Sequence, residues 1–172
     1  MIPNGVRLRW TEGKPVINGW LSTSSAFVAE IMSAQGYDSL TIDLQHGLVG
    51  YEAATAMLQA MRASGVTPMV RVPWLDPGDI MKALDAGAYG IICPMINSRA
   101  EAERLISYMH YPPQGQRSFG PTRAIFAAGA DYGQKADDEI LAFAMIETAE
   151  AMKNLDEIVT TPGLDGVYIG PA

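Results

Sequence analysis

An aspartate and a histidine three residues apart, Asp43 and His46, are the residues of this sequence best suited to acid–base chemistry. They follow the short apolar run 39–42, which is typical of a buried strand, and a glycine comes directly after the histidine. A carboxylate close to an imidazole can fix its tautomer and raise its basicity, which produces a general base near neutral pH. The alternative is a turn in which Asp43 caps backbone amides and His46 is exposed.

Two further charged residues end apolar runs. Arg71 closes the run 69–71, and its planar guanidinium suits a carboxylate or an enolate oxygen. The competing interpretation is a structural salt bridge to a carboxylate of a neighbouring loop. Glu147 closes the run 144–146 and is a natural oxygen ligand for a divalent cation, although a charge favoured at a helix N-terminus explains it equally simply. A second metal carboxylate should come from another strand end.

Lysine and serine chemistry is disfavoured. None of the four lysines is predicted at a strand end, where a Schiff-base lysine would be needed, and no Gly-x-Ser-x-Gly motif is present. The single cysteine, Cys93, lies in an apolar run and is expected to be buried and inert. Carbonyl activation by a metal is the natural substitute.

The overall composition limits the class of partner. The net charge of −7 comes without any basic run, so nucleic acid and anionic membranes are unexpected partners. No apolar stretch approaches the roughly 18 residues of a membrane span, and residues 1–10 do not resemble a signal peptide. One cysteine fits a reducing cytoplasm.

The elements that must position these residues alternate between strand and helix. Strands are expected at Val16–Leu21, Ser39–Asp43, Thr67–Val72, Gly90–Met95, Leu141–Glu147 and Gly166–Ile169. Most are separated by amphipathic helices, which predicts a parallel sheet covered by helices. The first strand lacks the glycine-rich fingerprint of a nucleotide-binding sheet. Polar residues at several strand ends favour instead a (β/α)8 TIM barrel, an α/β fold whose site is built there.

The count of strands does not complete such a barrel. Six βα units are predicted where eight are needed, so we expect a single barrel domain over residues 1–172 that is incomplete at its C-terminus. The long segment 111–135 is rich in turn-forming residues and breaks the regular spacing. Its Arg117 and Arg123 are candidates for binding anions or another subunit, and a solvated loop is equally compatible.

Seven motifs, in this order, resemble the HpcH/HpaI family of metal-dependent aldolases, which belongs to the phosphoenolpyruvate/pyruvate barrel superfamily. The resemblance covers about residues 19–172. It is carried by Ile42–Gly47, Val70–Pro73, Leu84–Ala88, Pro94–Ile96, Tyr111–Pro113 with Gly115 and Arg117, Ile146–Thr148 and Val167–Ala172.

The resemblance implies a role for each matching residue. His46 would be the acid/base acting through a water, Asp43 would orient it, and Asp85 would support the site. Arg71 would stabilise the ketone oxygen and the enolate, and Glu147 would bind the metal. Backbone amides at Gly170, Pro171 and Ala172 would hold the substrate carboxylate, and the second metal carboxylate is expected just after Ala172.

Two further features follow from the family. Some members carry glutamine where this chain has Met145, and members are usually trimers or hexamers. The resemblance implies a class II aldolase using Mg²⁺ or Mn²⁺, or Co²⁺, which adds a pyruvate or hydroxypyruvate enolate to an aldehyde. The alternatives are an acyl-CoA lyase of the same superfamily, for which no basic patch is found, and a non-catalytic barrel fragment.

Overall fold

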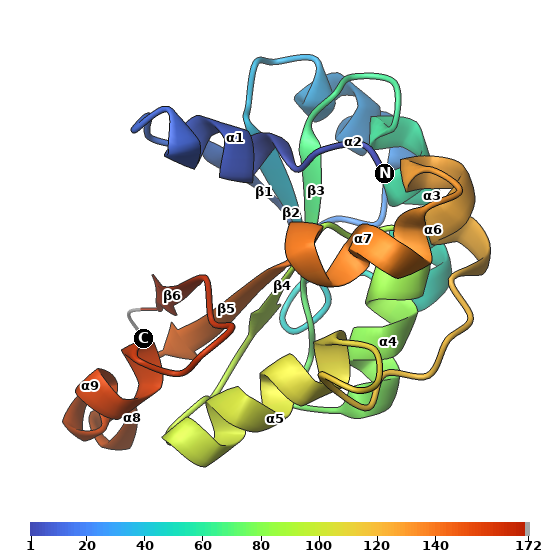
Figure 1. Ribbon diagram of the computed structural model, residues 1–172. Helices are drawn as coiled ribbons and strands as arrows, with labels where there is room; N and C mark the ends of the chain where they lie inside the picture. Colours follow the sequence, from blue (N-terminus) through green and yellow to red (C-terminus); the bar gives the residue numbers. More distant parts are fainter. Residues whose placement is uncertain (171–172) are drawn as a thin grey trace.

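Six parallel strands form one curled sheet in the computed structural model, which describes residues 1–170 (Figure 1). Their order in the sheet is their order in the chain, β1-β2-β3-β4-β5-β6, and every neighbouring pair is parallel. The strands are β1 Asn18–Leu21, β2 Ser39–Asp43, β3 Thr67–Arg71, β4 Gly90–Cys93, β5 Leu141–Ile146 and β6 Gly166–Ile169. This sequential order confirms the predicted α/β barrel architecture, as a half-barrel of six strands.

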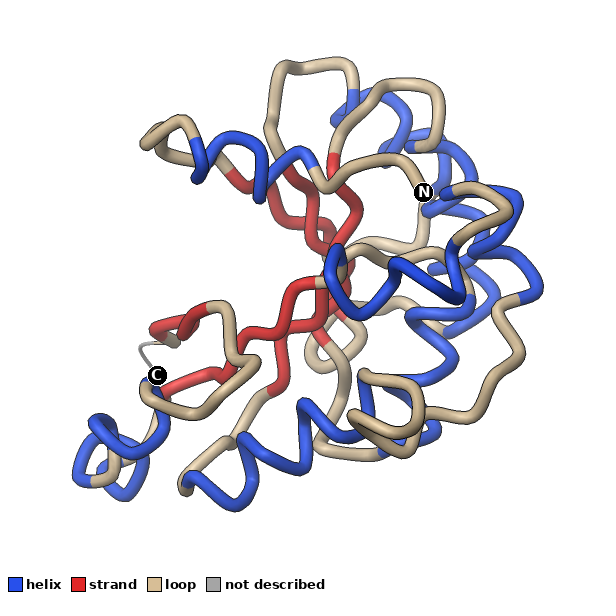
Figure 2. Tube along the Cα trace, viewed as in Figure 1, coloured by secondary structure: helices blue, strands red, loops and turns tan. Residues whose placement is uncertain are grey.

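Nine helices occur among the described residues, and most of them lie outside the strands (Figure 2). They are α1 Gly5–Thr11, α2 Ala26–Ser33, α3 Tyr51–Met61, α4 Pro77–Asp85, α5 Arg99–Met109, α6 Thr122–Ala128, α7 Tyr132–Glu139, α8 Ala149–Lys153 and α9 Leu155–Val159. Five of them follow an N-cap residue whose side chain accepts a hydrogen bond from a backbone amide of the first turn. These N-cap residues are Asn4, Ser25, Asp76, Ser98 and Thr148. Such a cap stabilises a helix by about 1 kcal/mol.

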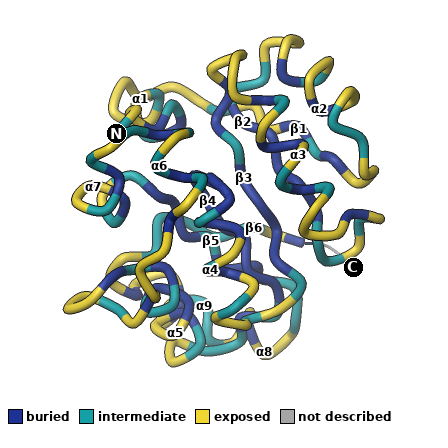
Figure 3. Tube along the Cα trace, turned by 90° about the vertical axis from the view of Figure 1, so that its right-hand side faces the viewer, coloured by how far each residue is buried: buried dark blue, intermediate teal, exposed yellow. Residues whose placement is uncertain are grey.

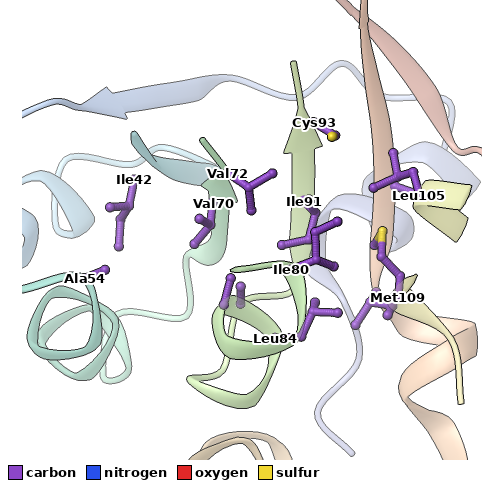
Figure 4. Close-up of a cluster of buried hydrophobic side chains, with 14 of the residues drawn as sticks. Ile42, Ala54, Val70, Val72, Ile80, Leu84, Ile91, Cys93, Leu105 and Met109 are labelled. Atoms are coloured by element: carbon purple, nitrogen blue, oxygen red, sulfur yellow. The ribbon is translucent and has the colours of Figure 1, made fainter. Parts of the chain in front are cut away.

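The outer face of the sheet packs on the helices. Val70 and Ile91 lie beside Ile80 and Leu84 of α4, and Leu105 comes from α5 (Figure 4). Cys93 is fully buried in the same core, as its apolar surroundings predict, and burial raises the pKa of its thiol. Figure 3 shows that most of the strand residues are buried.

The inner face carries a second, smaller cluster. Met69, Ile92 and Met145 are buried together, with Trp20, Phe143 and Tyr168 partly buried against them. Side chains along a strand alternate between its two faces, so a residue two positions after an inward-facing one also faces inward. Arg71 comes two positions after Met69, and Glu147 comes two positions after Met145. Asp43, Arg71 and Glu147 are therefore carried toward the inside of the barrel at its carboxyl end.

Three helical regions differ from the sequence-based expectations. The N-terminal segment forms α1, and the turn-rich segment 111–135 contains α6 and the first half of α7. Thr148 as a cap, followed by the apolar Leu155, Ile158 and Val159, predicts one helix, but the structure divides this segment at Asn154 into α8 and α9. These helices are short, and local sequence signals for short helices are weak because their stability comes mainly from tertiary contacts.

Helix α1 lies across the amino end of the sheet and contacts the segments that precede β2 and β6. Arg9 pairs with Asp38 before β2, and Arg7 pairs with Asp165 before β6, at 3.0 and 2.8 Å. Trp10 packs edge to face on Phe143 of β5. The end of the barrel opposite the predicted site is thereby held by α1. None of the helices in residues 1–170 has the length and apolar character needed to cross a membrane.

Candidate active site

The carboxyl ends of β2 and β3 place Asp43 directly beside Arg71. The two residues are register partners in the parallel ladder, and both belong to the buried part of the molecule. Arg71 Nε donates to Asp43 Oδ1 at 2.8 Å, and Arg71 Nη2 donates to Asp43 Oδ2 at 2.6 Å. This forked geometry fixes the plane of the guanidinium, which a single contact would not do.

The carboxylate of Asp43 also organises the turn that follows β2. Its Oδ1 accepts hydrogen bonds from the backbone amides of Gln45 and His46 at 3.0 and 3.2 Å. Gly47 is required in this turn, because a Cβ atom there would lie 2.2 Å from the carbonyl oxygen of Asp43. Burial raises the pKa of Asp43, but the hydrogen bonds from Arg71 and His46 outweigh it, so the pKa lies below its ordinary value of 3.8.

The contact between Asp43 and His46 differs from the one expected. The carboxylate binds the backbone amide of His46, and the structure records no hydrogen bond between Asp43 and the imidazole. The physical reason is that Arg71 and the amides of the turn already occupy both carboxylate oxygens. Asp43 thus positions the main chain of His46, whose residue is exposed. This is the capped turn that the sequence offered as its alternative.

Trp20 of β1 is a site residue that the sequence reasoning missed. Its indole Nε1 donates to Asp43 Oδ2 at 3.3 Å, and the Arg71 guanidinium carbon lies 4.9 Å from the centre of its ring. Tyr168 of β6 also packs on the ring of Trp20, and the two ring centroids are 5.4 Å apart. The available signal was the alternation of β1, which turns Trp20 to the inner face between Gly19 and Leu21.

Met145 of β5 faces the remaining edge of the guanidinium. Its Sδ lies 3.8 Å from Arg71 Nη1, a weak contact for a charged donor. Arg71 therefore directs two nitrogens at Asp43 and keeps Nη1 against a poor acceptor. A ligand oxygen could replace that contact with a stronger one.

Glu147 lies immediately beyond β5, ahead of the N-cap residue Thr148 of α8. Its Oε1 accepts a hydrogen bond of 2.8 Å from the backbone amide of Met95, in the loop after β4. The residue is half-buried. Glu147 precedes the helix, so its carboxylate is positioned by the hydrogen bond from the Met95 amide and not by an interaction with the first turn of α8.

The donor set for a metal is partial in the described residues. Glu147 supplies carboxylate oxygens, which suit a hard divalent cation. No group of three or more histidine, cysteine, aspartate or glutamate side chains that could hold a metal occurs within residues 1–170. The carboxylate of Glu147 has the donor chemistry of a single ligand, and the described residues do not complete a cation site around it.

The predicted carboxylate-binding segment is only partly described. Pro171 and Ala172 lie outside the described residues. The amide of Gly170 donates to the carbonyl oxygen of Ile146 at 3.2 Å, so it continues the β5–β6 pairing.

Asp85 is not brought together with the other predicted site residues. It is the last residue of α4, a helix that returns from the carboxyl end of β3 toward the amino end of β4. There its Oδ1 accepts a hydrogen bond of 2.6 Å from the buried guanidinium of Arg117, which also donates to Tyr132 Oη. Asp85 and Arg117 thus join α4 to the segment 111–121 at the opposite end of the strands.

Comparison with known proteins assigns the chain to a family. The profile of the HpcH/HpaI aldolase/citrate lyase family matches residues 17–172. A hydroxypyruvate/pyruvate aldolase of Rhizorhabdus wittichii is 48% identical over 98% of this chain and 67% of its own length. A 4-hydroxy-2-oxo-heptane-1,7-dioate aldolase of Shigella flexneri is 37% identical over 98% of this chain and 64% of its own. The chain spans about two thirds of the length of these relatives.

The solved structures agree with the sequence comparison. A family protein from Burkholderia cenocepacia J2315 superposes with a TM-score of 0.90 at 30% identity, covering 98% of this chain and 69% of its own. A protein described as citrate synthase SbnG superposes with a TM-score of 0.86 at 32% identity, covering 96% of this chain and 64% of its own. Membership of this aldolase family is consistent with use of a divalent cation. With its six sequential parallel strands and this match over residues 17–172, the chain belongs to the HpcH/HpaI aldolase/citrate lyase family.

Proposed function

We propose that this protein is a class II aldolase that adds the enolate of pyruvate or hydroxypyruvate to an aldehyde, and cleaves 4-hydroxy-2-keto acids in reverse. The observation that carries the proposal is the gathering of three groups at one end of the sheet, in a chain of this family. They are the Arg71 guanidinium fixed by Asp43, the exposed His46 on the same turn, and Glu147 beyond β5. The name of the R. wittichii relative supports the choice of enolate donor.

Arg71 binds the oxygen on which negative charge develops. Its plane is fixed by Asp43 and by the Trp20 ring, so little reorganisation is needed when the ketone of the keto acid becomes an enolate. The Nη1 group beside Met145 is the donor left for that oxygen. Removing one such donor typically costs a factor of about 100 to 1,000 in kcat.

His46 moves the proton. We assign to its imidazole, acting through a water, the removal of a C3 proton from the keto acid and its return during cleavage. The turn held by Asp43 sets the distance between His46 and Arg71, because one carboxylate binds the amide of the first and the guanidinium of the second.

Glu147 is the proposed ligand of a divalent cation, Mg²⁺ or Mn²⁺, or Co²⁺. When bound, the cation polarises the keto acid as a Lewis acid and supplies charge stabilisation that a lysine Schiff base provides in other aldolases. All four lysines lie in helices or, for Lys14, in the loop before β1, and none follows the carboxyl end of a strand. The second carboxylate ligand remains proposed just after Ala172.

The test is proton exchange at C3 of pyruvate, followed by NMR in D2O without any aldehyde. We expect exchange with Mn²⁺ or Mg²⁺, its loss on adding EDTA, and its loss in His46→Ala. The matched control is His110→Ala, because His110 is the only other histidine and ends α5 far along the chain. Exchange that survives EDTA, or enzyme inactivated by borohydride with pyruvate, would contradict the proposal.

Assembly and location are proposed on separate grounds. On the resemblance to this family we propose that the protein is a homo-oligomer, a trimer or a hexamer. Light scattering on the protein as it elutes from a size-exclusion column would measure its mass. The single buried thiol of Cys93 suits a reducing compartment, so we propose the cytoplasm as the location.

A further inference from the structure

A ring of hydrogen bonds, closed by the chain itself, includes one oxygen of the Glu147 carboxylate. The amide of Met95 donates to Glu147 Oε1 at 2.8 Å. The carbonyl oxygen of Met95 accepts from Asn97 Nδ2 at 3.1 Å, and Asn97 Oδ1 accepts from the hydroxyl of Thr148. Thr148 is the next residue after Glu147, so the chain itself closes the ring.

The backbone of Met95 is held in a conformation that a methionine rarely adopts. Its φ is +56°, in the left-handed region, and it is the only residue other than glycine with a positive φ within residues 1–170. Such a conformation is unfavourable for a residue with a Cβ atom and persists only where surrounding contacts impose it. The amide reaches Glu147 in this conformation, so whatever imposes it also sets the position of the carboxylate.

Asn97 supplies the contacts that impose it. Besides the two side-chain bonds of the ring, its amide donates to Glu101 Oε2 at 2.7 Å, and its carbonyl oxygen accepts from Asn154 Nδ2 at 2.7 Å. One half-buried residue therefore connects the loop after β4 to α5, to Thr148 and to the junction of α8 and α9.

The ring occupies only one oxygen of the carboxylate. Glu147 Oε1 is held by the Met95 amide, and within residues 1–170 no donor contacts Oε2. A hydrogen bond to one oxygen limits the directions that the carboxylate can take, while the other oxygen stays available to a cation.

We propose that Asn97 is a positioning residue for Glu147, fixing Met95 so that the carboxylate presents Oε2 to the divalent cation. This inference rests on the proposed function, which makes Glu147 a metal ligand. Asn97 touches neither the cation nor the substrate; it acts through the Met95 amide and the Thr148 hydroxyl.

The experiment measures Mn²⁺ binding to the metal-free full-length protein, by electron paramagnetic resonance of the unbound ion. Asn97→Ala is expected to weaken the Kd about 10-fold or more, the effect typical of groups that orient a metal ligand. Thr148→Val removes the hydroxyl of the ring, and Thr148→Ser keeps it. We therefore expect weaker binding in the first and near-normal binding in the second. Gln116→Ala is the matched control, since it removes an exposed side-chain bond to Ser107 in α5.

The outcomes separate this inference from the proposed function. A wild-type protein that does not bind Mn²⁺ overturns the metal site and this inference with it. A wild-type protein that binds Mn²⁺, with Asn97→Ala and Thr148→Val binding within twofold of it, overturns only the inference. If Asn97→Ala does not fold, the comparison of Thr148→Val with Thr148→Ser decides, because both keep Asn97.

Discussion

The buried pair of Asp43 and Arg71 offers the sharpest test of how the site is held. Replacing Asp43 by asparagine keeps an oxygen for the amides of the turn but puts an NH2 group where Oδ2 now accepts from Arg71. The guanidinium then faces a donor and loses its counter-charge. Replacing Arg71 by methionine leaves the carboxylate of Asp43 buried with only the neutral donors of the turn and Trp20.

The magnitude follows from the burial of both residues. Asp43 is 2% exposed and Arg71 is 8% exposed. Breaking such a pair by removing one partner costs about 3–5 kcal/mol, because a charge stays buried without its partner. Removing both charges avoids that penalty, so the double variant is expected to cost no more than either single variant. The coupling free energy in the cycle is then about 3 kcal/mol.

Urea unfolding of the metal-free protein at pH 7 measures the cycle. With a slope of about 1–3 kcal/mol/M, a loss of 3 kcal/mol lowers the midpoint by about 1–3 M. Single variants that each cost less than about 1 kcal/mol, or whose costs add in the double variant, would refute the reasoning. Such a result would mean that water reaches the pair in solution and that Asp43 does not fix the guanidinium.

Four further outcomes are expected. The pKa of Asp43 is lower in the folded state than its ordinary 3.8, so its contribution to stability is present above pH 3.8 and is lost as the pH falls through the folded-state pKa. Unfolding measured at decreasing pH should therefore show a smaller loss of free energy of unfolding in Asp43→Asn than in the wild type. At Met95, glycine should be more stable than alanine by about 1 kcal/mol in urea unfolding, the reverse of the usual order, because its φ is positive. Asp85→Asn should destabilise the protein by about 3 kcal/mol in the same assay, since it leaves the fully buried Arg117 side chain without its carboxylate. Cys93 should react with a thiol reagent only after unfolding, because burial raises the pKa of its thiol and excludes the reagent.

The sequence reveals which residues end strands, but not which of them meet. Asp43 and Arg71 are recognisable because a charge closes an apolar run in each case. Their pairing depends on the register between β2 and β3, which places them opposite each other, and register is a property of the assembled sheet. For this reason the sequence paired Asp43 with the imidazole of His46, three residues away, and offered a salt bridge between Arg71 and a loop carboxylate without identifying that carboxylate as Asp43.

The helices illustrate the same limit. The helix at Asp76 could be predicted because its cap, its proline and its closing glycine are all local signals. α6 and α7 lie in a segment rich in glycine and proline, and Tyr132 and Ala124 are held there by packing on Tyr89 and Tyr111. Such contacts join residues far apart in the chain, so no window of the sequence contains them.

Some charged groups of the site are engaged in contacts within the protein, and others are available to a ligand. Asp43 is fully engaged by Arg71, Trp20 and the turn, so its charge serves to place other groups. Three groups at the same end have little or no contact with other groups of residues 1–170: Arg71 Nη1, the imidazole of His46 and Glu147 Oε2. A hydrogen-bond donor, a titratable group and an anionic oxygen are what enolate formation requires for charge stabilisation, proton transfer and cation binding. The engaged residues therefore position the site, and the free groups are the ones that the proposed chemistry uses.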